Sequence, residues 1–194
     1  MLSASPNFIT IVSGLPRSGT SLLMQMLLAG GWPVLTDQVR AADEDNPKGY
    51  LEFEAVKQTK TSRDWLAHAQ GKAVKMVHLL LLQLPTTGYT YRVLLMKRKI
   101  AEVTASQRAM LQRQNKRGAN LTDQQLGQLF LSQLAQVENW LIEQPEFSVL
   151  PVNYNELVAN PAPLVEKINQ FLGGNLNAEA MIQTVDAKLY RQRA

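Results

Sequence analysis

A loop of small and hydroxylated residues separates two apolar runs between residues 8 and 28. This order of residue types predicts a strand, an anion-binding loop and a helix. Gly14 and Gly19 permit backbone angles that turn N–H groups inward, and the N-terminus of a helix favours a bound phosphate or sulfate. The residues predicted to bind the anion are Arg17, Ser18, Gly19, Thr20 and Ser21.

The loop nearly satisfies the phosphate-loop pattern G-x-x-x-x-G-K-[ST], but Thr20 occupies the lysine position and the cation stands at Arg17. Nucleotide triphosphatases use that lysine to reach the outer phosphates. Its replacement argues against hydrolysis of ATP or GTP and leaves phosphate binding intact. A turn with a purely structural role requires neither the arginine nor the hydroxyls beside it.

A second pair of anion-binding residues follows the apolar stretch 91–97, which predicts a buried strand. Arg98 comes directly after this strand, and Ser106 lies eight residues later in a predicted helix. If the helix begins near Ile100, the hydroxyl lies about two turns along it. One small phosphate group can then be shared by the guanidinium and the hydroxyl.

Composition and periodicity predict one α/β domain over residues 1–194. Hydrophobic residues make up 45% of the chain and charged residues 19%, which is typical of a globular protein with a sizeable core. Beyond the first strand and helix, strands are expected at 72–84, 91–97 and 147–152, with a shorter one at 32–35. Helices are expected at 50–69, 101–115, 122–143, 160–171 and 178–185. This alternation predicts a parallel sheet with helices on both faces, whose ligands bind beyond the carboxyl ends of the strands.

The chain has no cysteine and two histidines, so neither disulfides nor a metal site is expected. No membrane span or signal peptide is evident, which makes the cytoplasm the expected compartment. The net charge is +4, with basic residues concentrated at 97–117. Because no aromatic residues are interleaved there, the partner is expected to be a small anion and not nucleic acid. The oligomeric state is left open.

Three stretches resemble the sulfotransferases that use 3′-phosphoadenylyl sulfate (PAPS). GLPRSGTSLL at 14–23 resembles the family's 5′-phosphosulfate loop, and RVLLMKRKIAEVTASQ at 92–107 resembles its 3′-phosphate segment. VLPVNYNELVANPAPLVEKINQFLG at 149–173 resembles a segment near the family's C-terminus. The resemblance implies a three-layer, P-loop NTPase-like sulfotransferase architecture, PAPS as cofactor with PAP as its product, and no metal.

The resemblance also implies roles for particular residues. The loop 17–21 would hold the 5′-phosphosulfate end of PAPS, and Arg98 with Ser106 would hold the 3′-phosphate. Tyr154 is either a contact on the nucleoside side or a core tyrosine after a strand. The family's late Gly-rich cofactor loop has no match, and a late cation from Arg191 or Arg193 is an alternative to a solvated basic tail.

Sulfuryl transfer to a hydroxyl or amine requires a base for the acceptor's proton, and the sequence offers two candidates. Lys75 and His78 resemble the family's Lys-Thr-His element, but His78 lies one residue too far from the lysine. Because side chains alternate along a strand, this shift would turn His78 to the other face. Glu52 follows the NPKGY turn, and the family includes members with a glutamate base. Arg17 would stabilise charge that develops on the bridging and leaving oxygens.

The expected function is therefore sulfuryl transfer from PAPS to a small-molecule, glycan or lipid acceptor. Two alternatives stay open. A P-loop kinase or hydrolase would need a carboxylate that holds magnesium at a strand end, where this chain has cations. A non-catalytic module that binds phosphonucleotides would keep the loop without turnover.

Overall fold

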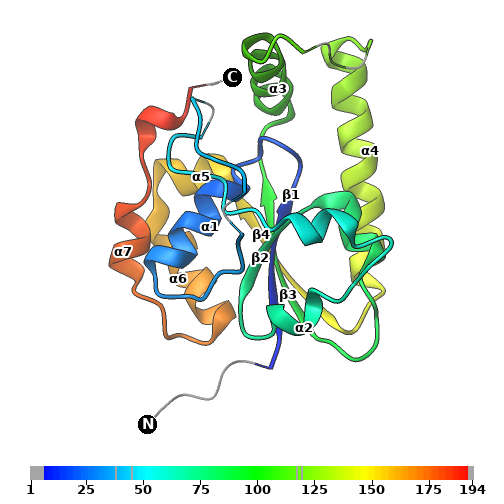
Figure 1. Cartoon of the computed structure of the whole chain (residues 1–194). Coiled ribbons are helices and arrows are strands. Elements are labelled where there is room, and N and C mark those ends of the chain that lie inside the picture. Colours follow the sequence, from blue (N-terminus) through cyan, green and yellow to red (C-terminus); the bar gives the residue numbers. More distant parts are fainter. Residues whose placement is uncertain (1–6, 38, 45, 117, 119, 192–194) are drawn as a thin grey trace.

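Four parallel strands form one sheet in the order β2-β1-β3-β4, with helices on both faces (Figure 1). The strands are β1 (Ile9–Gly14), β2 (Ala73–Val77), β3 (Tyr91–Lys97) and β4 (Phe147–Asn153). The structure is a computed structural model that describes residues 7–37, 39–44, 46–116, 118 and 120–191. The predicted α/β fold is confirmed.

The central strands are apolar along most of their length because both faces of the sheet are covered. All six residues of β1 are buried, as are five of the seven residues of β3. Gly14 at the end of β1 pairs with Val77 of β2 on one side and with Met96 of β3 on the other. The segments that follow these three strands therefore begin at one edge of the sheet.

One face is covered by α1 (Thr20–Ala29), α6 (Pro161–Leu172) and α7 (Ala178–Gln183), with α5 (Tyr154–Ala159) directly after β4. Leu23, Leu94 and Ile168 are fully buried in the core on this side. Proline at the first position of α6 fits a helix start, and Gly173 in the left-handed region ends it, as the sequence predicts.

The other face carries three short elements and one long helix, namely η1 (Glu54–Gln58), α2 (Leu66–Ala69), η2 (His78–Gln83) and α4 (Asp123–Ile142). Thr122 and Gln125 form a reciprocal capping box at the start of α4, as their spacing predicts. Ile11 and Val93 lie in the core beneath these elements. Within the described part of the chain, no helix combines the length and apolarity that crossing a membrane requires.

Helix α3 (Ile100–Arg113) lies beyond the carboxyl edge of the sheet and beside α4 (Figure 1). Val103 of α3 packs with Leu15, Phe130 and Leu134 in a small core of its own. Because Leu15 belongs to the loop after β1, this packing holds α3 next to the predicted anion-binding loop.

Three predicted elements differ from the structure. The stretch 32–35 forms a single bridge, between Val34 and Ala73, where a strand was predicted. The predicted helix 50–69 is broken into η1 and α2, because the polar residues between them supply no apolar stripe. The predicted strand 72–84 ends at Val77 and continues as η2, since a continuous apolar run does not distinguish a strand from a buried helical turn.

We expect Leu94→Ala to lower the free energy of unfolding by about 2–5 kcal/mol, because it opens a cavity beneath α1 and α6. Ile142, which is 84% exposed, provides the matched control. Ile142→Ala should change the unfolding free energy by less than about 0.5 kcal/mol. Urea unfolding of the two variants measures both values, and equal losses would contradict the assigned core.

Candidate active site

A cavity of about 730 Å³ opens at the carboxyl edge of the sheet. The loop after β1, helix α3 and the segment 40–57 form its walls. Among the described residues, eight lysines or arginines and three aspartates or glutamates line it. This excess of positive charge favours an anionic ligand, and the position is where parallel sheets bind their ligands.

The loop after β1 is packed closely against β3 and α5. Gly19 has φ +101, and a Cβ there would lie 2.3 Å from the ring of Tyr154. Arg17 also has a positive φ, +69, which is uncommon for a residue with a side chain. Helix α1 begins at Thr20, so the N–H groups of its first turn, which lack partners within the helix, lie at this loop.

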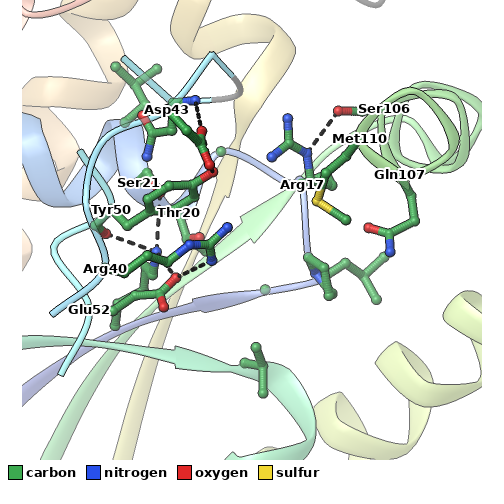
Figure 2. Close-up of a pocket in the computed structure, with 18 of the residues that line it drawn as sticks. Arg17, Thr20, Ser21, Arg40, Asp43, Tyr50, Glu52, Ser106, Gln107 and Met110 are labelled. Carbon is green, nitrogen blue, oxygen red and sulfur yellow. Dashed lines mark hydrogen bonds and ion pairs between the residues drawn. The ribbon is translucent and has the colours of Figure 1, made fainter. Parts of the chain in front are cut away.

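Arg17 connects the two anion-binding segments that the sequence predicts separately. Its Nε donates to Ser106 Oγ of α3 at 3.0 Å (Figure 2). Its backbone carbonyl accepts a hydrogen bond from Arg98 Nη1 at 3.1 Å. The two segments therefore line one cavity, together with Thr20, Ser21 and Tyr154.

Ser18 is the one residue of the predicted loop set whose side chain lies outside the cavity lining. It is buried, and its backbone N–H donates to the Leu15 carbonyl at 3.2 Å. A Cβ on Gly14 would lie 2.6 Å from Ser18 Oγ, so the hydroxyl occupies the space that this glycine leaves. The Ser18 side chain therefore packs inside the loop, against Gly14.

Glu52 lines the cavity, and its carboxylate contacts three cations. Oε1 lies 2.9 Å from Lys75 Nζ and 3.0 Å from Arg40 Nη1, and Oε2 lies 3.7 Å from Lys57 Nζ. Burial raises the pKa of Glu52, but these cations outweigh burial and hold the pKa below its ordinary value. The carboxylate is therefore ionised at neutral pH.

Lys75 is a cavity residue to which the sequence analysis gave no role. Its Nζ donates to Ser21 Oγ at 3.2 Å and to the Tyr50 carbonyl at 2.8 Å, in addition to its ion pair with Glu52. Burial lowers the pKa of Lys75, and Glu52 opposes that shift. A lone lysine in the buried strand AVKMV is the sequence signal that could have identified it.

Tyr50 holds the polar segment before it against the cavity. Its hydroxyl contacts both carboxylate oxygens of Asp43, at 2.7 and 2.9 Å, and the Arg40 guanidinium lies 3.4 Å from the centre of its ring. Burial and the hydrogen bond to Asp43 raise the pKa of Tyr50 to about 12. In Figure 2, these side chains and Glu52 form the wall opposite Ser106.

His78 lies away from the cavity, buried against α4. Its Nε2 is 3.0 Å from Gln133 Oε1, whereas Val77 and Leu80 line the cavity. Burial lowers the pKa of the imidazole, and the contact with Gln133 opposes that shift. The extra residue between Lys75 and His78 turns the ring to the other side, so Glu52 is the predicted base that reaches the cavity.

The last described residues also reach this cavity. Arg191 lines it, and its Nη1 donates to the Glu44 carbonyl at 2.8 Å. Arg191 is nevertheless an exposed residue. Arg193, the other predicted late cation, lies outside the described residues.

The protein is thus an α/β protein with two linked arginine-containing segments at the carboxyl edge of a parallel sheet, an arrangement that favours a multiply charged anion as ligand. The family model of the sulfotransferase domain matches residues 9–191, and the chain therefore belongs to the sulfotransferase family. It is an enzyme of sulfuryl transfer, a class in which PAPS is the typical donor. This membership favours the sulfotransferase prediction over a kinase, a hydrolase or a non-catalytic module.

Solved sulfotransferase structures share the fold. The sulfotransferase domain from the curacin biosynthetic pathway has a TM-score of 0.55 and 15% identity, covering 95% of this chain and 79% of its own. For the sulfotransferase domain of the Synechococcus PCC 7002 olefin synthase, the TM-score is 0.56 at 16% identity, with coverages of 98% and 82%. A sulfotransferase from Alicyclobacillus acidocaldarius gives 0.50 at 18% identity, with 88% and 82%. No curated protein sequence matches significantly.

We expect Glu52→Gln to lower the free energy of unfolding at pH 7 by about 1–3 kcal/mol, because Lys75 loses the carboxylate that compensates its buried charge. The pKa of Glu52 lies below its ordinary value of 4.5 in the folded state. Its stabilisation is thus complete above pH 4.5 and declines as the pH falls. Urea unfolding from pH 7 to acid should show the difference between parent and variant shrinking.

The control is Glu54→Gln, a more exposed carboxylate that also pairs with Lys57. It should change the unfolding free energy by less than about 0.5 kcal/mol. A difference between Glu52→Gln and the parent that stays constant into acid would contradict the ion-paired state assigned to Glu52.

Proposed function

We propose that this sulfotransferase takes its sulfuryl group from PAPS and releases PAP, with residues from both anion-binding segments holding the nucleotide. The observation that supports the proposal is the hydrogen bond between Arg17 Nε and Ser106 Oγ, which joins the predicted 5′ and 3′ segments in one cavity. The donor set of guanidinium groups, hydroxyls and a helix N-terminus fits a ligand with several phosphate or sulfate charges. When bound, PAPS supplies a sulfuryl group activated by a phosphate leaving group.

The 5′ end of the ligand is assigned to the loop 17–21. The Arg17 guanidinium provides positive charge where the leaving phosphate develops negative charge, and the hydroxyls of Thr20 and Ser21 add donors. Lys75 binds Ser21 Oγ and so restricts that hydroxyl to one orientation. These groups stabilise developing charge most effectively because they are fixed before the ligand binds.

The 3′-phosphate is assigned to Arg98 and Ser106. Tyr154 supports this side of the cavity, since the centre of its buried ring lies 4.4 Å from the Arg98 guanidinium carbon. The contact holds the guanidinium against one face of the ring. We therefore assign Tyr154 both roles that the sequence left open: it is a core residue, and it forms part of the wall of the nucleotide site.

Glu52 is assigned as the base that takes the acceptor's proton. Its lowered pKa makes it a weak base for a free hydroxyl. The attacking hydroxyl becomes far more acidic as its oxygen bonds to sulfur, so a weak base suffices late in the transfer. The ion pairs with Lys75 and Arg40 hold the carboxylate in the ionised state in which it accepts a proton.

The acceptor is assigned to the apolar part of the cavity. Phe53, Val56, Leu80 and Met110 line it together with Glu52. This lining favours a small molecule with an apolar body that carries the reacting hydroxyl or amine. We also propose that residues 1–194 form one domain and that the enzyme is cytoplasmic.

Calorimetric titration with PAP, and in parallel with ATP and magnesium, tests the proposed function. We expect tight binding of PAP that does not depend on magnesium, and much weaker binding of ATP, because the loop lacks the lysine that reaches outer phosphates. A preference for magnesium ATP would overturn the proposal. Release of PAP from PAPS in the presence of candidate hydroxyl and amine acceptors then measures turnover.

Arg98→Ala should weaken binding of PAP by about 10- to 150-fold, equivalent to about 1.5–3 kcal/mol for a lost contact with a charged group. Adenosine 5′-monophosphate (AMP) lacks the 3′-phosphate, so its affinity should change by less than about threefold. Arg108→Ala, on α3 but outside the cavity lining, is the control and should bind both nucleotides as the parent does. Equal losses for PAP and AMP would contradict the assignment of the 3′-phosphate.

A further inference from the structure

Tyr190 interacts with Arg98 directly through its ring and indirectly through Glu102. The centre of its ring lies 5.4 Å from the Arg98 guanidinium carbon. Its hydroxyl donates to Glu102 Oε1 at 2.6 Å, and Glu102 Oε2 accepts from Arg98 Nε at 2.8 Å. A residue near the end of the chain therefore acts on the arginine assigned to the 3′-phosphate, through an aromatic contact and through a shared carboxylate.

The charge of the Glu102 carboxylate is stabilised by the hydrogen-bond donors that surround it. Its side chain has no exposed surface, and Asn155 Nδ2 donates to Oε1 at 2.8 Å beside the Tyr190 hydroxyl. Burial raises the pKa of Glu102, but the hydrogen bonds from Tyr190, Arg98 and Asn155 outweigh it and lower the pKa below its usual value. A buried carboxylate that loses one donor is poorly compensated, so its remaining bonds, including the one to Arg98, lose their fixed geometry.

The segment that carries Tyr190 also lines the cavity. It comprises residues 184–191 and includes η3 (Ala187–Leu189). Lys48 Nζ donates to the Thr184 carbonyl at 3.0 Å, and Arg191 donates to the Glu44 carbonyl, so both ends of the segment contact the loop that precedes Tyr50. Asp186 and Leu189 line the cavity between these anchors.

We propose that Tyr190 is a positioning residue for Arg98, and that the segment 184–191 is held more firmly when a 3′-phosphate is bound. The proposal rests on the proposed function, because that function assigns the 3′-phosphate to Arg98. The two effects are reciprocal: if Tyr190 improves the binding of the phosphate, the bound phosphate stabilises the contact of Tyr190 by the same free energy.

Tyr190→Phe tests this role because it removes the hydroxyl and keeps the ring. We expect the affinity for PAP to fall about tenfold, the effect of one hydrogen bond to a charged group, while the affinity for AMP changes less than about twofold. Tyr89→Phe makes the same change outside the cavity lining and should leave both affinities unchanged. A merely structural role for Tyr190 would lower both affinities together, so the ratio of PAP to AMP affinity is the decisive value.

Hydrogen exchange of the segment 184–191, in the parent and in Tyr190→Phe, gives a second test. PAP should slow exchange there more than AMP does at equal saturation, and in Tyr190→Phe this difference should disappear. Failure of the parent to bind PAP would overturn the proposed function and the inference with it. If the parent binds PAP, an unchanged PAP-to-AMP ratio in Tyr190→Phe, or equal exchange with both nucleotides, would overturn the positioning role alone.

Discussion

The hydrogen bonds that Arg17 makes to Ser106 and receives from Arg98 are the interactions on which the site depends. They require β1 and β3 to be neighbours, since only then do the loop after β1 and the start of α3 emerge side by side. They also require a positive φ at Arg17, which turns its carbonyl toward Arg98 while its side chain reaches α3. Two segments about 80 residues apart thereby line one cavity.

Carboxylates fix the cations of this surface in place. Glu52 holds Lys75 and Arg40 on one wall, and Glu102 holds Arg98 near the other. Such pairing reduces the net positive charge that an entering anion meets. It also keeps long side chains from sampling many rotamers, so the ligand meets donors that are already oriented. The cations still outnumber the acidic residues of the lining, which preserves the attraction for an anion.

Local patterns predicted much of the fold and part of the site. The strand 91–97, the capping box at Thr122 and the helix stop at Gly173 follow from short-range chemistry, and the structure confirms them. The breaks within 50–69 and 72–84 were not predictable in this way, because apolar runs and a few polar residues are compatible with several local structures. Local sequence patterns did not predict long-range contacts. For example, nothing near Tyr190 in the sequence indicates that its hydroxyl reaches Glu102.

A crystal structure of the enzyme with PAP would show directly where the two ends of the ligand lie. The expected result is the 5′-phosphate at the loop 17–21 and the 3′-phosphate within hydrogen-bond distance of Arg98 and Ser106. A nucleotide bound in this cavity with its 3′-phosphate away from both residues, or bound elsewhere on the protein, would contradict it.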